Sequence, residues 1–167
     1  RLPTDQRLLP DLLGLVIADV SDKGIAAALY MALSRTVMRI VAKDTLDPAL
    51  ALRRVNRILL EDSSSGMFVT LFYGVLDLES GRLTYARAGH NPPLWLRASD
   101  RSVSELAPPG AVLGILDDPG IVRAEVALNA GDAVMMYTDG VTDEGILPFC
   151  HCEQSDCVAS CKEAISE

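Results

Sequence analysis

Two aspartates stand directly after apolar runs that are typical of buried strands. Asp19 follows LVIA, and Asp139 follows MMYT. A carboxylate at the mouth of a buried strand costs free energy unless another charge compensates it. Hard divalent cations such as Mg²⁺ and Mn²⁺ prefer oxygen ligands, and two of them sharing carboxylates can bind a phosphate and activate a water that attacks phosphorus. Aspartate is also a common turn residue, so these two residues by themselves favour a turn over a metal site.

A third candidate is the segment AGHNPP at 88–93. His90 titrates near neutral pH and could donate a proton or orient a ligand. Asn91 precedes a proline, an arrangement that equally favours a turn. Taken alone, a single histidine in a turn is more often structural, so these residues by themselves favour a structural role over a catalytic one.

The elements that must position these residues follow from apolar periodicity and turn signals. The run LGLVIADV at 13–20 has the length and Val/Ile content of a buried strand. Apolar residues then recur at helical spacing and predict a helix over 24–43. The recurring residues are Ile25, Leu29, Leu33, Val37, Ile40 and Val41.

A second helix is predicted over 47–61, with Asp47 as N-cap and Pro48 in its first turn. Its inner stripe consists of Leu52, Val55 and Leu59. Apolar or alternating runs between Gly- and Pro-containing turns then predict strands. These runs lie at 67–78, 83–89, 93–97, 102–106, 121–128 and 133–140. One strand, two helices and many short strands predict an α+β fold with antiparallel sheet rather than alternating βαβ units.

Composition and charge narrow the function classes. The 167 residues carry 15 Lys+Arg and 23 Asp+Glu, a net charge of −8 that argues against nucleic-acid binding and against a polybasic membrane surface. Hydrophobic residues make up 49%, enough for a buried core. No apolar run approaches the ~20 residues of a spanning helix, and no secretory signal is recognisable. These features predict a cytoplasmic protein that binds no membrane.

The cysteines gather late in the chain, at Cys150, Cys152, Cys157 and Cys161. Disulfides spread through a secreted fold would not cluster in this way, so the core is interpreted as a reduced intracellular domain. Together with His151, these thiols could hold Zn²⁺. Their spacing matches no common C-x2-C knuckle, and an irregular tail with reactive thiols is the favoured interpretation. We therefore predict one domain over 1–144 and a separate tail over 145–167.

Four segments, in collinear order, resemble those of one family. They are LVIADVSDKGIAAALYMALSRTVMR (15–39), MFVTLFYGVLDLESGRLTYARAGHNPPLWL (67–96), PPGAVLGI (108–115) and GDAVMMYTDGVTDE (131–144). They resemble the segments GDVSGKG-x-x-AAL-x-M, F-x-T-x-x-Y-G-x-x-D…AGHNP, G-x-x-LG and GD-x-L-x-x-YTDG-x-x-E. These segments belong to the sporulation-protein-E type branch of the metal-dependent (PPM, type 2C-like) serine/threonine protein phosphatases.

The resemblance implies a fold and a set of site residues. The fold is an antiparallel β-sandwich flanked by helices (αββα). Asp19 would bridge two Mn²⁺ or Mg²⁺ ions, with the backbone carbonyl of Val20 as a further ligand, and Asp139 would bind one of the ions. Both aspartates would therefore be catalytic. The residues expected near the phosphate are Lys23, Gly24, His90 and Asn91.

The chain also departs from the family pattern. Ala18 and Asp22 stand where GDVSGKG has its first two glycines, and Asp22 adds a negative charge near the metal edge. The family's upstream G-G-D-x-x-D and downstream D-D-x-T segments, which supply further metal-binding acids, do not occur in this sequence.

Three functional hypotheses follow. The leading one is a metal-dependent phosphatase acting on phosphoserine or phosphothreonine of a bacterial STAS-type anti-anti-sigma protein, in a partner-switching pathway and with a fused or associated sensor domain. The alternative is a catalytically incomplete module of the same fold that binds a phosphoprotein or relays a signal. The third hypothesis is a phosphatase that acts on small phosphoesters.

Overall fold

Two helices and seven short strands make up the part of the chain that the computed structural model describes, residues 11–61 and 66–140. The first half contains β1 (Leu12–Val20), α1 (Ile25–Asp44) and α2 (Pro48–Glu61). The second half contains β2 (Val69–Asp77), β3 (Arg82–Ala88), β4 (Leu94–Leu96), β5 (Val103–Glu105), β6 (Ala124–Ala127) and β7 (Ala133–Met135). The predicted order of elements is confirmed, with the last strand ending five residues earlier than the predicted 133–140.

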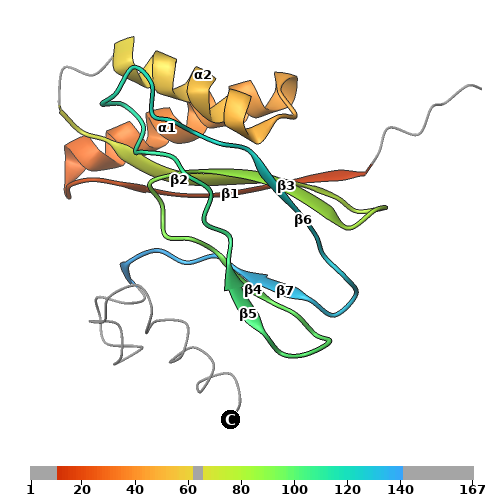
Figure 1. The fold of residues 1–167 in the computed structure, drawn as a ribbon. Helices are drawn as coiled ribbons and strands as arrows, with labels where there is room; N and C mark the ends of the chain where they lie inside the picture. Colours follow the sequence, from red (N-terminus) through yellow and green to blue (C-terminus); the bar gives the residue numbers. More distant parts are fainter. Residues whose placement is uncertain (1–10, 62–65, 141–167) are drawn as a thin grey trace, which may run out of the picture.

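The strands form two antiparallel sheets. One has the order β1-β2-β3-β6 and the other the order β5-β4-β7. Figure 1 shows α1 and α2 above the four-stranded sheet, with the three-stranded sheet on its opposite side. The predicted α+β sandwich is therefore confirmed. Within the described residues both helices cover the four-stranded sheet, and the outer face of the three-stranded sheet carries no helix.

The central strand β2 contributes to two separate cores, because successive side chains in a strand point to opposite faces. Leu71, Tyr73 and Val75 belong to the cluster between helices and sheet. Phe72, which is fully buried, belongs to the cluster between the two sheets. This arrangement explains why the sequence of β2 is apolar on both faces.

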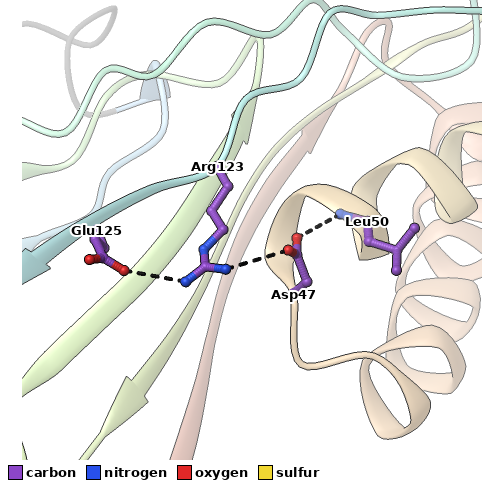
Figure 2. Close-up of polar contacts among 4 residues, drawn as sticks. All are labelled: Asp47, Leu50, Arg123 and Glu125. Carbon is purple, nitrogen blue, oxygen red and sulfur yellow. Dashed lines mark hydrogen bonds and ion pairs between the residues drawn. The ribbon is translucent and has the colours of Figure 1, made fainter.

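Helix α2 begins as its sequence predicts. The Asp47 carboxylate accepts a hydrogen bond from the Leu50 backbone N–H at 2.9 Å, which satisfies one of the free donors of the first turn. Figure 2 shows that the same carboxylate faces Arg123, at 3.8 Å, and that Arg123 also contacts Glu125 at 3.3 Å. The predicted inner stripe of α2 is fully buried.

The buried face of helix α1 is not the face that carries most of its large apolar residues. The predicted helix is confirmed, but Ile25, Leu29 and Ile40, three of the apolar residues whose spacing predicts it, are 82%, 68% and 61% exposed. The buried face consists of Ala27, Tyr30, Ser34, Val37, Met38 and Val41. Small residues at two of these positions allow close packing, and the Ser34 hydroxyl is satisfied by donating to the Tyr30 carbonyl at 2.7 Å.

By length and composition alone, α1 is the one described helix that could cross a membrane, with a mean hydropathy of 1.4 over its most apolar window. This finding differs from the prediction that no apolar run approaches the length of a spanning helix. Core helices pass the same test, and α1 packs Val37, Met38 and Val41 into the cluster that α2 and β2 share.

Strand β1 differs from the buried strand that its composition predicts. Among the described residues it pairs with β2 alone and forms an edge of the sheet. Leu12, Leu13 and Val16 are consequently 37%, 45% and 48% exposed. An apolar groove of about 550 Å³ runs between β1 and α1, lined by Leu12, Val16 and Met38 among others.

Candidate active site

Three chain segments converge at one end of the sandwich. Asp19 lies near the end of β1 and pairs with Thr70 of β2, while His90 follows β3. Asp139 lies on the segment that continues from β7 in the other sheet. The negative charges of Asp19 and Asp139 both raise the pKa of His90, so both carboxylates lie close enough to act on one imidazole. The sequence-predicted aspartates are therefore brought into one neighbourhood.

His90 is the buried centre of this site, with 2% of its surface exposed. Its Nδ1 atom lies 2.9 Å from the Thr70 hydroxyl. Burial lowers the pKa of His90 below its ordinary value; contact with the Tyr137 backbone and the charges of Asp19 and Asp139 oppose this shift, and Arg87 adds to it. The ring is therefore neutral at pH 7.

The turn that carries His90 is held by Arg87. The Arg87 guanidinium donates to the His90 carbonyl at 2.9 Å and to the Pro108 carbonyl at 3.2 Å. Gly89 adds a backbone hydrogen bond to the Gly110 carbonyl at 2.8 Å. The loop that begins at Pro108 thus fixes the His90 backbone.

Asp19 is half-buried and oriented by its neighbours. Its Oδ1 atom accepts a hydrogen bond from the Val20 N–H at 2.9 Å, and its backbone carbonyl lies 3.3 Å from the Thr70 hydroxyl. Asp139 is exposed. One carboxylate therefore has a fixed direction, and the other faces solvent at the same edge.

The loop between β1 and α1 has an unusual backbone at the positions where the family has glycine. Gly24 has φ +95°, a conformation that favours glycine, and a Cβ built on it would meet nothing within 4 Å. Asp22 has φ +84°, and its Oδ1 accepts from the Lys23 N–H at 2.8 Å. Two hydrogen bonds between Ser21 and Phe68, of 3.0 and 2.9 Å, attach this loop to the start of β2. The loop therefore leaves open space at the N-terminus of α1.

Lys23 and Asn91 are the other predicted residues near this site, and Thr70 and Arg87 are two further residues that contribute to it. Lys23 is exposed on the loop, and Asn91 is half-buried after His90. Thr70 and Arg87 were not singled out from the sequence. Thr70 is the threonine of the F-x-T segment, and Arg87 is a lone cation in the otherwise apolar run YARA, so each had a recognisable signal.

The donor set fits a hard cation in type but is short in number. Asp19, the Val20 carbonyl and Asp139 offer oxygen donors, which Mg²⁺ and Mn²⁺ prefer. Within residues 11–61 and 66–140 no group of three or more His, Cys, Asp or Glu side chains could hold a metal ion. Bound ions would therefore also need water or other ligands. The Cys150–Cys161 cluster lies outside the described residues.

The described residues thus form two antiparallel sheets with both helices on one of them, and they bring Asp19 and Asp139 near the same buried histidine. The chain matches the family described as Stage II sporulation protein E (SpoIIE) over residues 10–151, and it belongs to that family. It is 33% identical over 131 residues to the phosphoserine phosphatase RsbU of Bacillus subtilis. That match covers 78% of this chain and 39% of RsbU, so the chain spans about two fifths of this relative.

Solved structures agree with this assignment. The RsbU and RsbW domains of a Mycobacterium tuberculosis protein share 35% identity with the chain at a TM-score of 0.70, over 81% of this chain and 37% of theirs. The PP2C phosphatase domain of SpoIIE from Bacillus subtilis matches with a TM-score of 0.71 at 19% identity, over 91% of this chain and 42% of that one. RsbX, solved in complex with magnesium, matches with a TM-score of 0.61 at 17% identity, over 78% of this chain and 61% of that one. The chain therefore has the fold of the PP2C-type phosphatase domain of SpoIIE.

Proposed function

We propose that this domain is a metal-dependent phosphatase that hydrolyses phosphoserine or phosphothreonine on a regulatory protein. The observation that carries the proposal is the position of Asp19 and Asp139. Asp19 lies on β1 and Asp139 on the segment after β7, more than a hundred residues later, yet both charges act on the same buried His90. Two carboxylates near one another can share a divalent cation, and a bound divalent cation also attracts a phosphate.

Each residue has a part in the proposed mechanism. Asp19, the Val20 carbonyl and Asp139 would hold Mn²⁺ or Mg²⁺, two ions by family resemblance. Such ions, when bound, neutralise phosphate charge and lower the pKa of a water near phosphorus. Gly24 leaves the N-terminus of α1 open, and backbone N–H groups at a helix N-terminus favour a phosphate. Lys23 is exposed beside it and adds positive charge.

His90 and Asn91 were expected near the substrate, and we assign them different parts. Asn91 remains a candidate for contact with the phosphoprotein because part of its surface is accessible. His90 is 2% exposed, which favours a role behind the reacting groups rather than in contact with substrate.

The proposed substrate is a phosphorylated STAS-type anti-anti-sigma protein in a bacterial partner-switching pathway. The support is the similarity to RsbU and to a structure that joins RsbU and RsbW domains. In the same proposal the domain occupies residues 1–144, with a separate cysteine-containing tail over 145–167. It works in the cytoplasm with a fused or associated sensor domain.

A second candidate function is a non-catalytic module that binds a phosphoprotein or relays a signal. The observation that favours it is the short donor set, since the described residues contain no cluster of three or more side-chain ligands. The two candidates differ in turnover and in metal dependence.

The deciding experiment measures hydrolysis of an aryl phosphate, and then of a phosphoserine-bearing STAS protein, by the 167-residue chain with millimolar Mn²⁺ or with EDTA. Asp19→Asn and Asp139→Asn should each lower Mn²⁺-dependent turnover by about 100-fold or more, since a metal ion contributes several kcal/mol to such a transition state. Asp77→Asn is the matched control, because Asp77 ends β2 at the opposite end from Thr70. Absence of turnover in folded wild-type protein would favour the non-catalytic module.

A further inference from the structure

The buried position of His90 raises the question of why a polar ring is kept there. Its Nε2 atom makes no hydrogen bond of normal geometry within the described residues. A buried donor or acceptor without a full partner costs about 1–3 kcal/mol, which an apolar side chain would avoid. Such a group in a folded protein calls for a specific explanation.

The contacts of the ring join the two sheets. Nδ1 faces the Thr70 hydroxyl on β2, in the four-stranded sheet. The Tyr137 backbone, which raises the pKa of the ring, belongs to the segment continuing from β7 of the three-stranded sheet. Nδ1 already faces Thr70, so Nε2 is the nitrogen left to interact with the Tyr137 backbone, although no hydrogen bond of normal geometry joins them. Tyr137 lies two residues before Asp139, and Thr70 pairs with Asp19.

The proton positions follow from the partners. A carbonyl can only accept, so a neutral ring facing Tyr137 carries its proton on Nε2. Nδ1 is then an acceptor, and the Thr70 hydroxyl donates to it. That hydroxyl has one proton, so its 3.3 Å contact with the Asp19 carbonyl is the weaker of its two interactions.

From this geometry we propose that His90 is a positioning residue, which with Thr70 holds the segment carrying Asp139 against the strand carrying Asp19 and so sets the relative placement of the two carboxylates. The inference rests on the proposed function only in treating those carboxylates as metal ligands. Arg87 supports the arrangement by fixing the backbone of the His90 turn. Partners that orient metal ligands in this indirect way typically change metal affinity by 10–100-fold when removed.

The test compares Thr70→Val, which removes the hydroxyl at nearly constant shape, with Thr70→Ser, which keeps it. Thr84→Val is the matched control, since Thr84 lies half-buried on β3 in the same sheet. The first readout needs no metal: amide hydrogen exchange of metal-free protein, followed by mass spectrometry of the peptide over 134–140. We expect Thr70→Val to accelerate exchange of that peptide at least about fivefold, and Thr70→Ser and Thr84→Val to leave it within about twofold.

The second readout is the Mn²⁺ dissociation constant from calorimetric titration, which Thr70→Val should raise about 10-fold or more. The third is the imidazole ¹⁵N spectrum, which should show the Nε2–H tautomer. Unchanged exchange over 134–140 in Thr70→Val would overturn the positioning role, as would an unchanged Mn²⁺ affinity in a wild-type protein that binds Mn²⁺. A wild type that binds no Mn²⁺ contradicts the proposed function, and the exchange result then decides the positioning role alone.

Discussion

The side chain of Asn56 should be worth several kcal/mol to this fold. It is 1% exposed on the inner side of α2. Its Oδ1 accepts from the buried Gly114 N–H at 2.9 Å, and its Nδ2 donates to the Leu116 carbonyl at 2.8 Å. Both partners belong to the loop that also reaches the His90 turn through Gly110. Replacing Asn56 therefore tests how the helical layer is attached to the site.

The expected cost of Asn56→Ala follows from its two partners. The Gly114 N–H is buried and loses Asn56 Oδ1 as its acceptor, at a cost of about 1–3 kcal/mol. Leu116 is 47% exposed, so water can replace part of the second hydrogen bond, which leaves a loss of about 0.5–1 kcal/mol. We expect Asn56→Ala to lower the free energy of unfolding by about 2–4 kcal/mol, a large share of the 5–15 kcal/mol typical of a domain.

Urea unfolding checks this value, followed by the fluorescence of Trp95, the single tryptophan, and by far-ultraviolet circular dichroism. Asn56→Asp is the companion variant, since it keeps the acceptor for Gly114 but buries a carboxyl group. Burial raises the pKa of a carboxyl, so the protonated form is favoured in the folded state and this variant should gain stability, relative to wild type, as pH falls from 8 to 5. A loss below 1 kcal/mol in Asn56→Ala, with an unchanged denaturant slope, would refute the reasoning.

Three further predictions concern local features. Asp47→Ala should lower the free energy of unfolding by about 1 kcal/mol because it removes the cap of α2. Arg123→Ala should lower it by less than about 0.5 kcal/mol because the ion pairs of Arg123 are exposed (Figure 2). Equal losses in urea titrations would contradict this ranking. Burial lowers the pKa of His90, so the stability contributed by the neutral ring is present above pH 6.5 and is lost as the pH falls further. When the pH is lowered from 7.5 to 5.5, the urea midpoint of metal-free wild type should therefore decrease more than that of His90→Gln. Asp22→Ala should be less stable than Asp22→Gly by about 1 kcal/mol in thermal unfolding, since the φ of +84° is costly for alanine and free for glycine.

Local signals were sufficient for the parts of the fold that local interactions determine. Helix α2 is the clearest case, because its cap residue, its first-turn proline and its apolar stripe all lie within the same fifteen residues. The β2–β3 hairpin is similar, since its turn and alternating residues are adjacent in the chain. Asp19 lies near the end of β1 as its sequence predicts, whereas Asp139 lies four residues beyond the end of β7.

The parts that sequence reasoning missed depend on distant partners. The buried face of α1 is chosen by what packs against it, so Ser34 is buried while Leu29 is exposed. The edge position of β1 depends on how many strands pair with it, which its own residues do not encode. The Thr70–His90 contact joins residues twenty positions apart through the sheet, and the burial that makes it informative appears only in the folded chain.

The edge strand β1 also bears on the solubility of this chain. Its residues 12–18 (LLGLVIA) form an uncharged apolar run, and among the described strands only β2 pairs with it; unpaired apolar edges of this kind template intermolecular strand addition. The charges that flank it are Asp11 and Asp19. Charged residues at the ends of such runs act as gatekeepers against aggregation. The Asp19 carboxylate, which is proposed to bind metal, therefore also opposes self-association at one end of this apolar segment. Asp19→Asn removes that charge and should make the segment more prone to aggregation.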